Sequence, residues 1–160
     1  MADLFLKLDG IPGESADDKH KGEIEIESFS WGLSHTGSIS GGGGGGAGKA
    51  QFHDLNLHAF TSAASPKLFV SAASGRHLKE ALLTARRAGG KEAVDFYKVK
   101  LTDVLISSYN NAGSDDQSSL TDSFSLNFAK IEVSYAPQKQ DGSLDDPITG
   151  GWDLKQNKEV

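Results

Sequence analysis

One segment has the spacing of a phosphate-binding loop. Residues 43–50 match the pattern GxxxxGK[ST] up to its last position. In that pattern backbone amides cradle phosphate, the lysine contacts it, and the final hydroxyl binds Mg²⁺. Ala50 has no hydroxyl, and the glycine spacing arises by chance within a run of Gly41, Gly42, Gly43, Gly44, Gly45 and Gly46. We therefore interpret this run and Lys49 as part of a flexible loop and expect no nucleotide site.

The histidines and serines form no catalytic or metal-binding motif. No H-E-x-x-H or G-x-S-x-G pattern occurs, and the chain has no cysteine, which excludes disulfides, thiolate zinc sites and cysteine catalysis. If residues 52–58 form a strand, His53 and His58 project to opposite faces. The other histidines are His20, His35 and His77. We expect no catalytic residue, no metal and no cofactor, and hence a protein that is not an enzyme.

Two groups of charged residues leave alternatives open. One is the alternating series Glu23, Glu25 and Glu27, which fits the solvated face of a strand or the lining of a channel in an assembly. The other is a basic cluster in an acidic chain, made of Lys79, Arg86, Arg87 and Lys91. It fits either a solvated face or a patch complementary to an acidic edge of another copy.

The elements that position these residues are mainly strands. Period-two alternation or short apolar runs predict strands at 4–8, 23–27, 52–57, 99–107 and 121–135, with a bulge or bend near 129–130. Ser65 as N-cap, Pro66 at the first helical position and Gly75 as a stop predict one short helix. Residues 77–88 have helical propensity, although Gly89-Gly90 and the alternation that follows them suggest a hairpin. The glycine-rich stretch at about 32–49 predicts an extended loop.

Composition limits the function classes. The 160 residues correspond to one domain, residues 1–160, and 16 basic against 22 acidic residues give a net charge of −6. That charge argues against nucleic-acid binding. No apolar run is long enough for membrane insertion, and the first residues lack the features of a secretory signal peptide.

Several segments together resemble the Hcp family, the haemolysin-coregulated tube proteins of bacterial type VI secretion. The resemblance covers essentially the whole chain, and the set of segments in this order is specific although each alone is weak. The segments include Phe29-Ser30-Trp31-Gly32-Leu33-Ser34, the glycine run with Lys49, Ser65-Pro66-Lys67-Leu68, Arg87-Ala88-Gly89-Gly90, Leu126-Asn127-Phe128-Ala129-Lys130-Ile131, Tyr135-Ala136-Pro137-Gln138 and Gly151-Trp152-Asp153.

The resemblance implies a mainly β fold, a compact β-barrel of two sheets with one short flanking α-helix. It also implies hexameric rings that stack into a tube, with a contractile sheath, a spike protein and secreted effectors as partners. The protein is then assembled in the bacterial cytoplasm and secreted without a signal peptide. Residues 78–87 become a strand, the glycine-rich loop packs between subunits or rings, and Ser30 faces the lumen as an effector contact. The competing hypothesis is a monomeric small β-barrel that binds a ligand.

Overall fold

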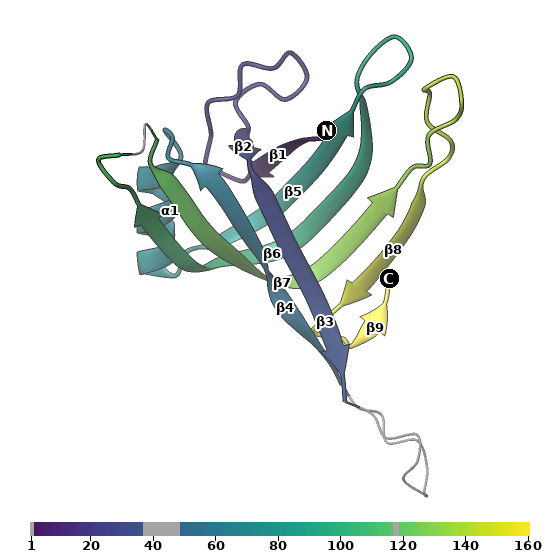
Figure 1. Ribbon diagram of the computed structural model, residues 1–160. Coiled ribbons are helices and arrows are strands. Elements are labelled where there is room, and N and C mark those ends of the chain that lie inside the picture. Colours follow the sequence, from purple (N-terminus) through teal and green to yellow (C-terminus); the bar gives the residue numbers. More distant parts are fainter. Residues whose placement is uncertain (1, 37–48, 117–118) are drawn as a thin grey trace, which may run out of the picture.

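The computed structural model describes residues 2–36, 49–116 and 119–160, and Figure 1 traces their path. Within these residues lie one helix, α1 (Ser65–Ser74), and nine strands. The strands are β1 (Asp3–Leu8), β2 (Ile24–Ile26), β3 (Ser28–His35), β4 (Ala50–Phe60), β5 (His77–Arg87), β6 (Val94–Ala112), β7 (Thr121–Tyr135), β8 (Ile148–Asp153) and β9 (Lys158–Glu159).

The strands form one antiparallel sheet that forks at β7. The main path runs β2-β1-β5-β6-β7-β4-β3, while β8 pairs with β7 and β9 with β8. Positions 121–126 of β7 pair with β4, and positions 130–135 pair with β8. The predicted fold, a mainly β barrel with one short flanking helix, is confirmed. The two sheets expected for the barrel are continuous with each other, because both are parts of this one forked sheet (Figure 1).

The two ends of the sheet are joined by the chain rather than by a strand ladder. β2 and β3 lie at opposite ends of the pairing order, yet only Glu27 separates them in the sequence. The backbone N–H of Glu27 donates to the carbonyl of His58 in β4, at 2.7 Å. The sheet therefore curls round until its ends meet at this residue, without hydrogen-bonded closure between β2 and β3.

The core fills the space inside the curled sheet. Leu83 of β5, Leu101 of β6 and Leu126 of β7 are completely buried, and full burial of such a side chain stabilises a fold by about 1.5–3 kcal/mol. Residues 77–87 form strand β5 despite their helical propensity, as the resemblance implied. This strand pairs with β1 on one side and β6 on the other, so tertiary pairing outweighs local preference.

Helix α1 matches its prediction except at its first residue. Pro66 lies in the first turn, and Gly75 ends the helix in a left-handed conformation with φ 67°. The predicted N-cap is wrong by one position, because Ala64 is the N-cap and Ser65 is the first helical residue. The Ser65 hydroxyl instead donates a hydrogen bond to the Asp122 carboxylate in β7.

The predicted bend near residues 129–130 involves two strands. In β6 the buried positions switch from odd to even residue numbers between Leu101 and Val104, and in β7 they switch from even to odd between Phe128 and Ile131. These two places lie opposite each other in the strand pair. Asp103, which lies across from Ala129 in β6, has a φ of 55°, in the left-handed region that non-glycine residues rarely adopt. Pairing keeps its register on both sides of Asp103. The register shift of this strand pair lies further along, between Ile106 and Ser108.

The prediction that a loop begins at residue 32 is wrong. β3 continues through Gly32 to His35, and β4 starts at Ala50. Leu33 pairs with Phe52 in this extension, so the ladder to β4 keeps Gly32 in an extended strand despite its low β propensity. Residues 37–48, which include the run from Gly41 to Gly46, lie outside the described part of the chain.

Candidate functional site

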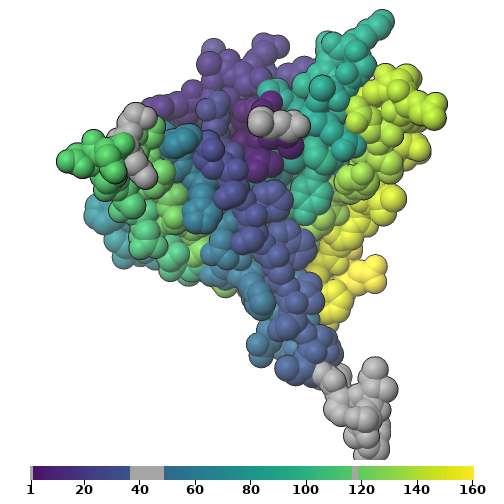
Figure 2. All heavy atoms as spheres, in the orientation of Figure 1, coloured from purple at the N-terminus to yellow at the C-terminus, as the bar shows by residue number. Residues whose placement is uncertain are grey.

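Four strands present a polar surface to solvent. Alternation along β3 turns Phe29 and Trp31 toward the core and leaves Ser30 exposed on the other side, opposite Asn56 of β4. Figure 2 shows β3 and β4 running down the middle of one side of the molecule. We call this surface the polar face. Its members are Ser28 and Ser30 of β3, Asp54, Asn56 and His58 of β4, Ser107 and Ser108 of β6, and Ser123, Ser125 and Asn127 of β7.

Hydrogen bonds link the strands across the polar face. The Asp54 carboxylate accepts from the Asn127 amide at 2.9 Å and from the Ser107 hydroxyl at 2.5 Å. The Ser125 hydroxyl lies 2.7 Å from that of Ser107 and 2.6 Å from that of Ser108. Hydroxyl and amide groups both donate and accept hydrogen bonds. Hydrogen-bonding groups rather than charged groups therefore dominate this surface.

One pair on the polar face has the residue types of a nucleophile and its base. The Ser123 hydroxyl lies 2.9 Å from His58 Nδ1, and sequence reasoning missed the pair because 65 residues separate the two. A catalytic pair of this kind also needs a group that orients the histidine. Among the hydrogen bonds of the described residues, none joins a carboxylate to His58. The pair is therefore interpreted as part of the cross-strand network.

Directly behind the polar face lies a buried carboxylate. Asp122 of β7 is 2% exposed and accepts hydrogen bonds from four neutral side chains. We call these residues the Asp122 cluster, and the donors are Thr61 (3.1 Å), Tyr109 (2.9 Å), Asn111 (2.8 Å) and Ser65. Burial, followed by the bond to Asp122, raises the pKa of the Tyr109 hydroxyl. The cluster ties α1 to the ends of β4, β6 and β7.

His20 anchors the segment between β1 and β2 to the barrel. Its ring is stacked on Phe5 at 4.4 Å, with Nδ1 2.9 Å from Glu23 and Nε2 3.1 Å from Asp95. Burial of the ring opposes protonation, but hydrogen bonds to Asp95 and Glu23 outweigh it and raise the pKa of His20 above its usual value. His20 therefore has a structural role, and Glu23 contributes to that role.

Arg86 also holds the segment between β1 and β2 on the barrel. This corrects the interpretation of Arg86 as part of a basic patch for an acidic edge of another copy. Its guanidinium pairs with Asp17 at 2.7 Å and Asp3 at 3.3 Å and lies 4.8 Å from the centre of the Phe5 ring. The hydrogen bond from Arg86 holds the pKa of Asp17 at about 2. Arg86 is thus committed within the chain, and Arg87 stacks on Phe96 at 4.2 Å. Sequence spacing could not show these partners.

The remaining predicted residues lie apart from this surface or need correction. His53 and His58 were expected on opposite faces, but a register shift between Ser30 and Gly32 places both on the side of the polar face. Lys49 is exposed immediately before β4. A strand rather than a helix follows it, which does not fit the context of a phosphate-binding loop.

Two further observations concern metals and membranes. Within residues 2–36, 49–116 and 119–160, no group of three or more histidine, aspartate or glutamate side chains could hold a metal ion. The same residues contain no helix with the length and apolarity needed to cross a bilayer.

Comparison with known proteins identifies relatives over the whole chain. The model of the family described as "Type VI secretion system effector, Hcp" matches residues 5–135. Protein hcp1 of Pseudomonas aeruginosa is 42% identical over 156 residues, which cover 97% of this chain and 96% of that protein.

Solved structures agree with the sequence comparison. A type six secretion system protein is similar with a TM-score of 0.92, 31% identity and complete coverage of both chains. Hcp1 from Salmonella typhimurium is similar with a TM-score of 0.81, 36% identity and 99% coverage of each chain. The chain therefore belongs to the Hcp family of type VI secretion system proteins.

Proposed function

We propose that six copies of the chain form a ring, that rings stack into a secretion tube, and that the polar face lines the lumen. Ser30 contacts effectors carried there. Membership of the Hcp family supports the tube role. The observation that carries the assignment of the lumen is the polar face itself, because ten polar residues on four strands share one side of the sheet, all but Ser125 are at least partly exposed, and Asp54 is their single carboxylate.

The chemistry of the polar face suits cargo that must be held and then released. A typical hydrogen bond contributes only about 0.5–1.5 kcal/mol net, so several weak contacts can hold a protein without trapping it. A strongly charged lumen would instead select cargo by its net charge. Ser30 is exposed near the centre of β3 with no bulky neighbour across the strand pair, because Asn56 lies opposite.

The wider role includes partners and a route out of the cell. The tube works with a contractile sheath and a spike protein, and the chain is made and assembled in the bacterial cytoplasm. It is then secreted without a signal peptide. The glycine-rich segment with Lys49 packs between subunits or rings. In this role the protein is structural rather than catalytic, needs no cofactor, binds no nucleic acid and does not insert into membranes.

The native mass tests the ring. We expect size-exclusion chromatography with light scattering to give a species six times the 16.9 kDa chain mass. A clean monomer over a wide range of concentrations would contradict a ring formed by this chain alone.

Substitution on the polar face tests the lumen contact. We expect Ser30→Tyr to leave the hexamer intact and to reduce the amount of effector proteins in the culture supernatant of the producing bacterium, measured by quantitative mass spectrometry. Lys7→Tyr, at an exposed position of β1, is the matched control. Equal effector release by both variants, with the chain itself secreted normally, would reject the role of Ser30.

A monomeric ligand-binding barrel is the second candidate. Its ligand would need space inside the barrel, where Leu83, Leu101 and Leu126 are completely buried in the core. A monomeric mass together with a ligand retained through purification would favour this alternative over the tube.

A further inference from the structure

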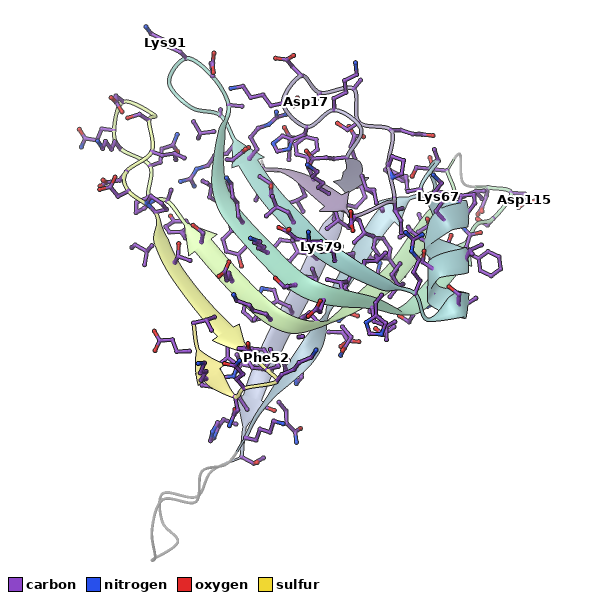
Figure 3. The ribbon with its side chains drawn as sticks, turned by 180° about the vertical axis from the view of Figure 1, so that it is seen from behind. Asp17, Phe52, Lys67, Lys79, Lys91 and Asp115 are labelled. Atoms are coloured by element: carbon purple, nitrogen blue, oxygen red, sulfur yellow. The ribbon has the colours of Figure 1, made fainter. Side chains whose placement is uncertain are left out.

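The segment between β1 and β2 is tied at its neck and held more loosely at its tip. We call residues 12–23 the strap, and Figure 3 shows Asp17 on it, at one end of the molecule. The backbone hydrogen bonds of the neck stay within the strap and run from the N–H of Gly13 to the carbonyl of Gly22 (2.8 Å) and from the N–H of Ser15 to that of Glu23 (3.0 Å). Among the described residues, no backbone group of the tip, residues 16–21, bonds to the backbone of the barrel. The tip therefore depends on its side chains for attachment.

Three side-chain contacts attach the tip to the barrel, and each joins an acidic to a basic residue. They are Asp17–Arg86 (2.7 Å), Lys19–Glu92 (2.8 Å) and His20 Nε2–Asp95 (3.1 Å). The side chains of Lys19 and Glu92 are more than half exposed, and exposed pairs contribute little. Arg86 stays charged throughout the neutral range, and Asp17 is ionised down to a pKa of about 2. The contact made by His20 is therefore the one of the three whose charge can change near neutral pH.

Both ring nitrogens of His20 face carboxylates. Nδ1 lies 2.9 Å from Glu23 of the strap and Nε2 lies 3.1 Å from Asp95 of β6, while the side chain is 8% exposed. A protonated imidazole has two N–H groups, whereas a neutral one has one N–H and one lone pair. The protonated ring can donate to both carboxylates at once. The neutral ring must turn its lone pair toward one of them, and only the bond to Asp95 joins the strap to the barrel.

The charges on the other elements around His20 do not reverse this preference. The ring is stacked on Phe5 of β1 at 4.4 Å, and the Arg86 guanidinium of β5 lies 4.8 Å from the centre of the same Phe5 ring. Asp17 and Asp3 pair with Arg86 and balance its charge. Asp17 also accepts a hydrogen bond from the His20 backbone N–H at 3.1 Å. The strap, β1, β5 and β6 together therefore favour the protonated ring.

We propose that the strap is a pH-dependent conformational switch, which closes on the barrel when His20 is protonated and opens when His20 is neutral. Opening breaks the contact between His20 and Asp95 and moves the tip away about the neck, whose backbone hydrogen bonds remain. It uncovers Phe5, which is 4% exposed in the closed form. The barrel stays folded, because the pairing of β1 with β5 does not involve the strap. The switch depends neither on the ring nor on the polar face.

The linkage to a single proton sets the direction and steepness of the change. Opening releases one proton from His20, so the ratio of open to closed strap rises at most about tenfold for each pH unit. The rise begins above the usual histidine pKa of about 6.5. It levels off above the pKa of His20 in the closed strap, which is raised because the hydrogen bonds to Asp95 and Glu23 outweigh burial of the ring.

Hydrogen exchange of the full chain, followed by mass spectrometry from pH 6 to pH 9, measures the opening. Dividing each rate by the intrinsic rate at the same pH gives a protection factor. We expect the protection of the strap to fall as pH rises, by up to about tenfold for each unit, while residues 97–106 of β6 keep theirs. Protection of the strap that does not change with pH would overturn the proposal, as would an equal fall in the strap and in β6.

Asp95→Asn separates the switch from a simple loss of an ion pair. The side-chain amide can donate to the lone pair of a neutral ring as well as accept from a protonated one. We therefore expect a shallower fall with pH than in wild type, and higher protection of the strap than wild type at pH 9. A fall as steep as that of wild type, or protection at pH 9 no higher than that of wild type, would overturn the role of His20.

Glu92→Gln is the matched control, since it also replaces a carboxylate that holds the tip but leaves the surroundings of His20 unchanged. We expect the same steepness of the pH dependence as in wild type. A pH dependence that disappears in Glu92→Gln would assign the change to the Lys19–Glu92 pair and overturn the switch at His20. Circular dichroism checks folding, and Glu23→Gln, which places an amide beside Nδ1, replaces Asp95→Asn if that variant does not fold.

Discussion

Asp54 and Asp122 occupy opposite sides of the same pair of strands and illustrate two uses of one residue type. Asp122 points inward, is 2% exposed, and is surrounded by four donors that join α1 to the barrel. Asp54 lies on the polar face and accepts from Ser107 and Asn127. The groups that bond to the two carboxylates are similar, but water can reach Asp54 and not Asp122. Burial therefore decides whether such a carboxylate stabilises the fold or is available to a partner.

The largest expected effect is at Asp122. Asp122→Ala leaves the buried Ser65 hydroxyl and the partly buried Thr61 and Tyr109 hydroxyls without this acceptor, and each buried unsatisfied group costs about 1–3 kcal/mol. Because some of the donors can turn to solvent, we expect the free energy of unfolding to fall by about 3–5 kcal/mol. Urea denaturation followed by circular dichroism measures it. Asp122→Asn, which keeps acceptor capacity, should lose less, and an equal loss in both variants would show that packing rather than hydrogen bonding is responsible.

The second effect concerns Arg86, which joins the segment after β1 to β5. Arg86→Ala removes two ion pairs and the contact with Phe5, and we expect a loss of about 1–2 kcal/mol at neutral pH. Asp17 has a pKa of about 2 in the fold, below the usual 3.8. Its contribution to stability is therefore present above pH 3.8 and is lost as pH falls through about 2.

The pH dependence of unfolding checks the Arg86 prediction. The difference in stability between wild type and Arg86→Ala should shrink on acidification toward pH 2. Arg87→Ala is the matched control, since Arg87 stacks on Phe96 and does not contact Asp17. An Arg87→Ala curve with the same acid dependence would show that Asp17 is not the titrating group.

The third effect is a pH dependence of opposite sign at His20. The pKa of His20 is raised in the fold, since Asp95 and Glu23 favour the protonated ring. Its contribution is fully present below the unfolded value of about 6.5 and is lost as pH rises through the folded value. We expect the stability difference between wild type and His20→Gln to decrease from pH 6 to pH 8. Thermal unfolding across this range measures it, and a difference that grows with pH would contradict the assigned hydrogen bonds.

The sequence predicts those parts of the fold that depend on local signals. Pro66 and Gly75 mark helix α1 because a fixed φ and a left-handed stop act within a few residues. The alternation of Phe29, Ser30 and Trp31 places Ser30 on the exposed side for the same reason. The predicted N-cap fails because the Ser65 hydroxyl bonds to Asp122, 57 residues away.

Other features depend on contacts that no local pattern records. Strand β5 forms against helical propensity because strands pair with it on both edges. Gly32 remains in β3 because β4 pairs with it. The basic cluster does not form one free patch, because Arg86 pairs with carboxylates in β1 and in the segment that follows β1. His53 and His58 share a side of the sheet because a register shift lies between their partners in β3.

The smallest expected effect is at Asp54, and it completes the comparison with Asp122. Asp54→Ala leaves Ser107 and Asn127 without their acceptor, but both groups lie at the surface and can bond to water. We therefore expect a loss of no more than about 1 kcal/mol in the same urea titration. If Asp54→Ala and Asp122→Ala destabilised the chain equally, burial would not be the distinction between the two sites. If Asp54→Ala is nearly neutral for stability and still reduces effector release, the polar face is free to serve cargo because the fold does not depend on it.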